Sequence, residues 1–282
     1  MTGTLVLVAT PIGNLGDLSP RAVQELSDAD LICCEDTRRT GRLLVHAGIS
    51  GARLKRLDDH TERAGTEVVL DELAAGHRVA LVSDAGTPAI SDPGERLVAA
   101  VVGAGYTVTA VPGPSAVIAA LVASGLATSR FVYEGFLARK GGDRTTAIAR
   151  IAAESATTVM YESPNRLAAT LRDLAAACGG ERPAVVAREL TKLHEEFVRG
   201  TLDELAVWAD DGVKGEIVVV IAGAEPPAEA DDESVVAAVQ AAMAAGSSRR
   251  DAIANVASDL GIRRGRVYDL ALTIPGGVTP PP

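Results

Sequence analysis

Aromatic side chains are scarce in this 282-residue chain, where phenylalanine, tyrosine and tryptophan together make up only 3%. That composition disfavours a protein that binds single-stranded nucleic acid mainly by stacking bases on aromatic residues. Cysteine is also rare. Of the three cysteines, Cys33 and Cys34 are adjacent, which gives neither a disulfide framework nor the spacing of a zinc site. We therefore expect no metal centre and a reducing, cytoplasmic location.

Charge is absent from one long stretch, Leu97 to Ser129. Its length alone would span a bilayer. Glycines and prolines at six positions, however, divide it into short pieces, which predicts a buried helix, strand and helix rather than a membrane span. Near the N-terminus the first basic residue is Arg21, so no charged segment precedes the apolar run Leu5–Ala9. We therefore expect no signal peptide and no membrane partner.

Positive charge is in deficit overall, with 27 Lys and Arg against 37 Asp and Glu. The net charge of −10 argues against nucleic-acid binding over the whole surface, but the local distribution differs. The segment 38–56 carries six basic residues and no acidic one, and arginines gather again between Arg249 and Arg266. Each basic cluster is either a solvated face or a local phosphate-binding surface.

Short β-branched runs alternate with helical segments through the first half of the chain. The runs Thr4–Ala9, Leu31–Cys34, Arg78–Ser83 and Thr107–Val111 are typical of strands. Ser-Pro and Asp-Pro pairs at 19–20 and 92–93 have the residues preferred at a helix start, and the second predicts a helix through Val102. A further helix is expected at Ala116–Ala123. This alternation predicts an α/β fold with a mostly parallel N-terminal sheet.

A second, mixed α/β set follows. We expect strands at Phe131–Phe136, Thr157–Tyr161 and Ala184–Glu189, a flexible loop at Gly141-Gly142, and a helix over Ser163–Ala177. The segments Glu195–Gly200 and Glu216–Ile221 are expected to be neighbouring strands, with a capping box at Thr201–Glu204 between them.

These patterns divide the chain into four regions. We expect an N-terminal α/β domain over 1–125, a second α/β domain over 126–223, an acidic linker over 224–233 and a helical domain over 234–276. The helical domain contains the stretches Ser234–Ala245, Arg249–Leu260 and Arg263–Leu272, and the last two have helix-turn-helix spacing.

Three loops follow predicted parallel strands and therefore lie at the edge where such sheets bind ligands: Ala9–Leu15, Ser83–Pro88 and Pro112–Ala116. None contains the G-x-G-x-x-G or P-loop pattern, so nucleotide binding by those devices is unsupported. Asp84 is suited to accept hydrogen bonds from ribose hydroxyls or an amino group. The amides near Ser115 are suited to hold a carboxylate at a helix N-terminus.

The ordered segments LVATPIGNLGDLSPRAVQEL, EDTRRT, SDAGTPAISDPG, VPGPSA, YEGFL, YESPNRL, ARELTK and KGEIVVVI carry a resemblance across residues 4–222. The chain resembles the tetrapyrrole methylases, and within them the branch that methylates the 2′-oxygen of a cytidine in 16S ribosomal RNA. The resemblance implies a two-domain fold, S-adenosyl-L-methionine as cofactor, and a homodimer acting on 16S RNA in the 30S subunit. The C-terminal helices resemble that branch's helix-turn-helix extension. The cofactor positions implied by matching motifs are Pro11, Ile12, Gly13, Asp84, Ala85, Gly86, Thr87, Ser115, Ala116, Tyr161 and Gly215.

A ribose hydroxyl is a weak acid, so its methylation gains from a hydrogen-bond acceptor and a group that holds phosphate. Asp36 is a candidate proton acceptor and Arg38 a candidate phosphate ligand, although Asp36 also fits a helix N-cap. Lys192 is a candidate to hold phosphate or to lower the pKa of the hydroxyl, although an ion-paired strand end is equally consistent with its sequence. Two other functions remain open: methylation of a corrinoid or other tetrapyrrole, and a nucleic-acid-binding protein that holds the cofactor only as a ligand.

Overall fold

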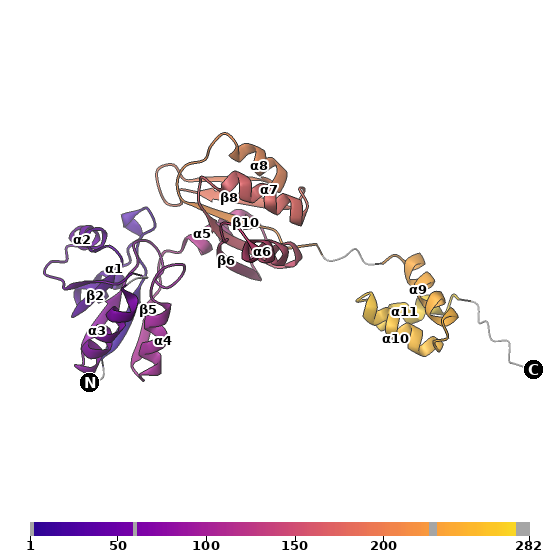
Figure 1. Cartoon of the computed structure of the whole chain (residues 1–282), viewed down its shortest axis with the longest axis horizontal. Coiled ribbons are helices and arrows are strands. Elements are labelled where there is room, and N and C mark those ends of the chain that lie inside the picture. Colours follow the sequence, from indigo (N-terminus) through magenta and orange to yellow (C-terminus); the bar gives the residue numbers. More distant parts are fainter. Residues whose placement is uncertain (1–2, 59–60, 226–229, 275–282) are drawn as a thin grey trace, which may run out of the picture. The chain divides into compact units, whose positions relative to one another are not determined.

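The computed structural model describes residues 3–58, 61–225 and 230–274 (Figure 1). The chain forms two compact units, residues 1–224 and 225–282. The first unit contains the elements β1 (Thr4–Val8), η1 (Leu15–Asp17), α1 (Pro20–Ser27), β2 (Leu31–Cys34), α2 (Thr37–His46), β3 (Leu54–Arg56), α3 (Glu62–Ala74), β4 (Arg78–Leu81), α4 (Glu95–Gly103), β5 (Thr107–Val111), α5 (Ala116–Ser124), β6 (Phe131–Phe136), α6 (Gly142–Ala153), β7 (Thr157–Glu162), α7 (Leu167–Cys178), β8 (Pro183–Arg188), β9 (Glu196–Thr201), α8 (Leu202–Ala209) and β10 (Ile217–Ile221). The second contains α9 (Asp232–Ala244), α10 (Arg249–Asp259) and α11 (Arg264–Ala271).

The first sheet is parallel throughout, with the strand order β3-β2-β4-β1-β5. Both faces are covered by helices, so alternate strand residues enter two different cores. Leu5 packs with residues of α3 and α4, and Val6 packs with residues of α1 and α2. The adjacent Cys33 and Cys34 likewise point into opposite cores, and both thiols are free. The expected parallel sheet is confirmed.

The second sheet is mixed, with the order β6-β7-β10-β8-β9. β6 and β7 are parallel, whereas β10 runs antiparallel to both β7 and β8. The expectation that Glu195–Gly200 and Glu216–Ile221 are neighbours is wrong, because β8 pairs with both β9 and β10 and lies between them. The capping box between Thr201 and Glu204 is confirmed.

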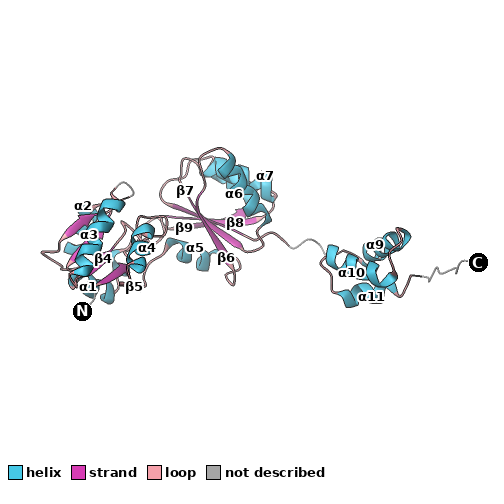
Figure 2. Ribbon diagram, turned by 60° about the horizontal axis from the view of Figure 1, so that its bottom comes forward, coloured by secondary structure: helices cyan, strands magenta, loops and turns pink. Residues whose placement is uncertain are grey.

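Helices cover both faces of the second sheet as well (Figure 2). α5 packs its buried residues Val117, Ala120 and Leu121 against one face, and α6, α7 and α8 pack against the other. The uncharged stretch from Leu97 thus forms α4, β5 and α5, as expected. Within the described residues, no helix is long and apolar enough to cross a membrane.

Three local expectations are wrong, and each error has a physical cause. The helix expected from Asp92-Pro93 begins at Glu95, because the buried carboxylate of Glu62 accepts hydrogen bonds from the amides of Gly94 and Leu97 in place of an Asp92 cap. The helix expected from Ser163 begins at Leu167, after a turn in which the carbonyl of Ser163 accepts from two following amides. Gly141-Gly142 is the start of helix α6 rather than a flexible loop.

The second unit has a small apolar core of its own. Val235 and Val239 of α9 pack with Ile253 of α10 and Val267 of α11. The three helical stretches expected from the sequence are confirmed within about two residues of their bounds. Arg250, Arg263 and Arg264 are exposed, which leaves positive charge on the surface of this unit.

Candidate functional site

Hydrogen bonds join the three sequence-predicted loops at the carboxyl edge of the first sheet. Thr10 and Gly86 exchange two backbone hydrogen bonds of 2.9 and 3.0 Å, and the hydroxyl of Thr87 donates to the carbonyl of Pro114. The loops after β1, β4 and β5 therefore form one connected surface. This edge is where parallel α/β sheets bind ligands.

Two glycines allow the close approaches in this surface. Gly86 has φ +83°, a left-handed conformation that side chains other than glycine rarely adopt. At Gly13, a Cβ atom would lie 2.4 Å from Cγ of Lys192 and 2.8 Å from Oγ1 of Thr191. The neighbouring amide of Asn14 donates to that threonine hydroxyl. The loop after β1 therefore contacts the loop after β8 because residue 13 has no side chain.

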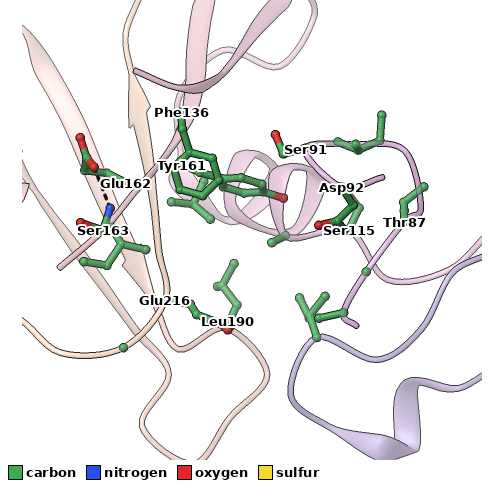
Figure 3. A pocket seen from close by; sticks show the side chains of 18 of the residues that line it. Thr87, Ser91, Asp92, Ser115, Phe136, Tyr161, Glu162, Ser163, Leu190 and Glu216 are labelled. Carbon is green, nitrogen blue, oxygen red and sulfur yellow. Dashed lines mark hydrogen bonds between the residues drawn. The ribbon is translucent and has the colours of Figure 1, made fainter. Parts of the chain in front are cut away.

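A cavity of about 360 Å³ lies between these loops and the second sheet (Figure 3). Its volume is in the range that holds a small molecule or cofactor. Its lining residues are Ile12, Ala85, Gly86, Thr87, Ile90, Ser91, Asp92, Ser115, Ala116, Phe136, Tyr161, Glu162, Ser163, Pro164, Leu190, Gly215, Glu216, Ile217 and Val218.

The cavity is largely apolar, with polar groups at defined positions. Ile12, Leu190 and Ile217 supply aliphatic wall. The N-terminus of α5 opens on the cavity at Ser115, whose side chain makes no capping hydrogen bond to the helix. The first amides of α5 and the helix dipole therefore favour an anionic group at this end.

One wall of the cavity is formed by a strained segment. Ala89 and Ser91 have φ values of 66° and 58°, an unusual conformation for residues other than glycine. Two hydrogen bonds hold the segment Ala89–Gly94 in place. The amide of Gly94 donates to the carboxylate of Glu62, and the hydroxyl of Ser91 lies 2.6 Å from that of Tyr133 on β6. Strain of this kind persists where surrounding contacts hold it, and it concentrates at functional sites.

Tyr161 on β7 forms the opposite wall with Phe136 (Figure 3). Burial raises the pKa of the Tyr161 hydroxyl, and the neighbouring Tyr133 raises it further. The phenol therefore stays protonated at neutral pH, so this wall carries no charge.

Lys192 lies at the cleft in a cluster with two carboxylates. Its ammonium is 2.8 Å from Oε1 of Glu189 and 2.9 Å from Oε2 of Glu216, and Glu216 lines the cavity. Burial opposes the charged form of Lys192, but hydrogen bonds to the two carboxylates outweigh it and raise the pKa of the lysine. The Lys192 ammonium and the amide of Glu216 together lower the pKa of Glu189. The ion-paired alternative for Lys192 is thus the arrangement found.

Asp36 and Arg38 lie on a different surface, at the start of α2. The carboxylate of Asp36 caps this helix by accepting from the amides of Arg38 and Arg39, and these bonds lower its pKa. Asp36 and Arg38 line a shallow groove with Gly41, Arg42 and Val45. Asp36 therefore does cap α2, and the cap lowers the basicity of its carboxylate, whereas its role as a proton acceptor stays a prediction.

Asp84 connects the two surfaces. Its carboxylate accepts from the amide of Asp36 at 3.2 Å and pairs with the guanidinium of Arg39 at 3.3 Å. With Pro11, it lines a depression next to the main cavity rather than the cavity itself.

The structure thus brings most of the implied cofactor positions together. Eight line the cavity, namely Ile12, Ala85, Gly86, Thr87, Ser115, Ala116, Tyr161 and Gly215, whereas Pro11, Gly13 and Asp84 lie beside it. The sequence did not point to a place in the site for Ser91, Asp92, Phe136, Leu190 or Glu216, and Asp92 was expected only as a helix cap. Each lies inside one of the quoted motifs. The sequence therefore indicated the motif but not that these side chains line the cavity. No group of three or more potential metal ligands exists among the described residues.

The fold and the cavity define a class of protein. The family model described as Tetrapyrrole (Corrin/Porphyrin) Methylases matches residues 4–206, which include the first sheet and every strand of the second except β10. Ribosomal RNA small subunit methyltransferase I of Mycobacterium tuberculosis is 50% identical over 273 residues, covering 96% of this chain and 95% of the relative. The protein of the same name from Escherichia coli O157:H7 is 43% identical over 276 residues, covering 96% and 95%. The chain belongs to this methyltransferase family within the tetrapyrrole methylases.

Solved structures share the fold at low sequence identity. Cobalt precorrin-4 methyltransferase, a cobalamin biosynthetic enzyme, matches with a TM-score of 0.61 at 18% identity, covering 79% of this chain and 96% of that one. Uroporphyrin-III C-methyltransferase from Thermus thermophilus, complexed with S-adenosylhomocysteine, matches with a TM-score of 0.56 at 20% identity, covering 78% and 96%. These two matches confirm the tetrapyrrole methylase fold.

Proposed function

We propose that the protein transfers a methyl group from S-adenosyl-L-methionine to the 2′-oxygen of a cytidine ribose in 16S ribosomal RNA. The observation that carries this proposal is the near-full-length identity of 50% to ribosomal RNA small subunit methyltransferase I. The site of action is the cavity between the two sheets, in the cytoplasm, on RNA within the 30S subunit.

The residues of the cavity fit this cofactor. Aliphatic side chains such as Ile12, Leu190 and Ile217 suit an adenine ring, and the N-terminus of α5 at Ser115 suits the methionine carboxylate. When bound, S-adenosyl-L-methionine supplies a sulfonium methyl group that is already activated for transfer. The contribution of the chain is therefore to position the ribose and exclude water, and positioning alone provides large rate enhancements.

Lys192 is proposed to act at the cleft, because it is the predicted catalytic residue whose partner Glu216 lines the cavity. The Glu189 and Glu216 carboxylates hold the ammonium in one place, where it orients a ribose hydroxyl or phosphate that enters the cleft. These contacts support a role for Lys192 in positioning the substrate.

Asp36 and Arg38 are proposed to bind RNA through the groove on α2. The side chain of Arg38 is 90% exposed, and Arg42, one helical turn further on, is also exposed. Two arginines at this spacing project from one face and suit the phosphates of a backbone. Asp36 holds the helix start that presents them.

A homodimer is also proposed, with α5 contributing to the interface. Ile118 and Val122 lie one turn apart on α5 and are 46% and 66% exposed, although the other side of the helix is buried. Exposed apolar side chains that share a face favour association. Light scattering should give twice the chain mass for the wild type, and Val122→Glu should shift it toward the monomer. A monomeric wild type would contradict the dimer.

The substrate class can be tested by offering labelled S-adenosyl-L-methionine with 30S subunits, 50S subunits or a tetrapyrrole. We expect label only in the 30S RNA. Label in the tetrapyrrole would support the small-molecule alternative. Cofactor binding without transfer to any of the three would support a protein that holds the cofactor only as a ligand.

A further inference from the structure

Aromatic residues are concentrated at one end of the cavity, although the chain has only three phenylalanines, four tyrosines and one tryptophan. Tyr133, Phe136 and Tyr161 contact one another in series. The ring centres of Tyr133 and Tyr161 are 5.4 Å apart and nearly perpendicular, and those of Tyr161 and Phe136 are 5.3 Å apart. Phe136 and Tyr161 both line the cavity.

A β-bulge places these rings on the same face of the sheet. On β6, Tyr133 pairs with Val159 and Phe136 pairs with Tyr161, so between these pairs two residues of β6 oppose one of β7. In a regular strand, residues three apart point to opposite faces. The extra residue reverses the direction of Phe136, and Gly135 within the bulge has φ +64°. Bulges next to active sites commonly redirect a side chain in this way.

In this stack Tyr133 is held by a hydrogen bond, whereas Phe136 is exposed to solvent. Ser91 holds the hydroxyl of Tyr133, and Tyr161 is packed between Tyr133 and Phe136. Phe136 is 56% exposed, the largest exposed fraction among the large hydrophobic residues that line the cavity. An exposed ring that packs on Tyr161, itself packed on Tyr133, presents an apolar surface to a group that enters from solvent.

We propose that Phe136 is the platform on which the target nucleobase stacks while its ribose lies in the cleft. This inference rests on the proposed RNA substrate. A base removed from its stack in folded RNA loses stacking energy, and an aromatic side chain restores part of it. One such platform for a single base is consistent with a chain that is otherwise poor in aromatic residues. Because the ring lies on the exposed side of the cavity, we assign it to the RNA rather than to the adenine of the cofactor.

The test compares Phe136→Leu, Phe136→Trp and Phe131→Leu, the last being a control on the same strand with a 38% exposed ring outside the cavity. Methyl transfer to 30S subunits gives KM and kcat, and calorimetry gives the affinity for S-adenosylhomocysteine. We expect Phe136→Leu to lower kcat/KM at least about tenfold, mainly through KM, without weakening S-adenosylhomocysteine binding. Phe136→Trp should retain activity within about threefold, since it keeps a stacking surface.

Three results would overturn the platform. Wild-type kinetics in Phe136→Leu would show that the ring has no such role. Weaker S-adenosylhomocysteine binding with an unchanged KM for 30S subunits would assign the ring to the cofactor. If the wild type transfers no methyl group to 30S RNA, the proposed function fails and the platform fails with it, a result distinct from the other two.

Discussion

The hydroxyl of Ser91, which lines the cavity, lies 2.6 Å from the hydroxyl of Tyr133, which packs behind the lining residue Tyr161. Ser91 belongs to the strained segment after β4, whereas Tyr133 belongs to β6 of the second sheet. This hydrogen bond therefore connects the first sheet's ligand-binding edge to the second sheet. It also fixes the inner end of the aromatic stack.

Removing this contact should weaken cofactor binding. A hydrogen bond within the fold contributes about 0.5–1.5 kcal/mol net, so loosening it by Tyr133→Phe should weaken S-adenosylhomocysteine binding by up to about tenfold. The ring and its packing remain, so the loss in unfolding free energy should be limited to this one hydrogen bond, about 0.5–1.5 kcal/mol. Calorimetric titration measures the affinity, with Tyr268→Phe in the second unit as the matched control. Unchanged affinity in Tyr133→Phe would show that the contact does not shape the site.

Glu62 should contribute to the stability of the folded protein, although it does not line the cavity. Its side chain is buried and accepts from the amides of Gly94 and Leu97, which begin α4. Glu62→Ala leaves these amides unpaired, and we expect a loss of about 1–3 kcal/mol. Thermal unfolding followed by circular dichroism measures the loss as a lower Tm. Glu67→Ala, an exposed glutamate of the same helix, is the control, and equal Tm values for the two variants would exclude the capping role.

Lowering the pH should reduce the stabilisation that the ion pair between Glu189 and Lys192 gives to the folded protein. Lys192 lowers the pKa of Glu189, so the folded protein holds the ionised carboxylate more strongly than the unfolded chain does. This contribution is complete above the unfolded pKa, near about pH 4.3, and is lost as the pH falls through the lower folded value. The difference in unfolding free energy between wild type and Glu189→Gln should therefore shrink from about pH 6 to about pH 3.

Urea unfolding at several pH values measures this difference, and Glu181→Gln supplies an exposed glutamate as control. A difference that stays constant across the acidic range would show that Glu189 is not stabilised as its charged form.

The pattern of the sequence was sufficient for the parallel sheet, because both of its faces are buried and its strands are continuous apolar runs such as Leu31–Cys34. The sequence pattern did not predict local structure that depends on a side chain distant in sequence. Glu62, more than 30 residues away, sets the start of α4. Strand order failed for the same reason, since β10 pairs with β8, as at Ile217 and Arg188, rather than with β9, which precedes it more closely in sequence.

Some features of the site were likewise predictable from the sequence and others were not. Glycine-containing loops after strands indicated the edge that binds a ligand, and Gly86 and Ser115 do line the cavity. The direction of Phe136 was not predictable from alternation, because the bulge at Gly135 reverses it. Nor does the sequence alone show that Asp84 contacts Asp36 and Arg39 beside the cavity.

The groove on α2 makes a separate prediction about salt. Arg38→Ala should raise KM for 30S subunits and reduce the slope of log affinity against log salt by about one, because one phosphate contact is lost. S-adenosylhomocysteine affinity should not change, since Arg38 does not line the cavity. Titration of 30S binding at several salt concentrations measures the slope. Arg63→Ala, an exposed arginine of α3, is the control, and an identical slope for both variants would remove Arg38 from the RNA surface.

The most direct measurement is the chemical identity of the methylated nucleoside. Purified protein is incubated with labelled S-adenosyl-L-methionine and 30S subunits that lack the modification, and the RNA is digested to nucleosides for mass spectrometry. We expect one product, a cytidine whose added methyl is on the ribose. Label on a base, on another nucleoside or in no RNA at all would contradict it.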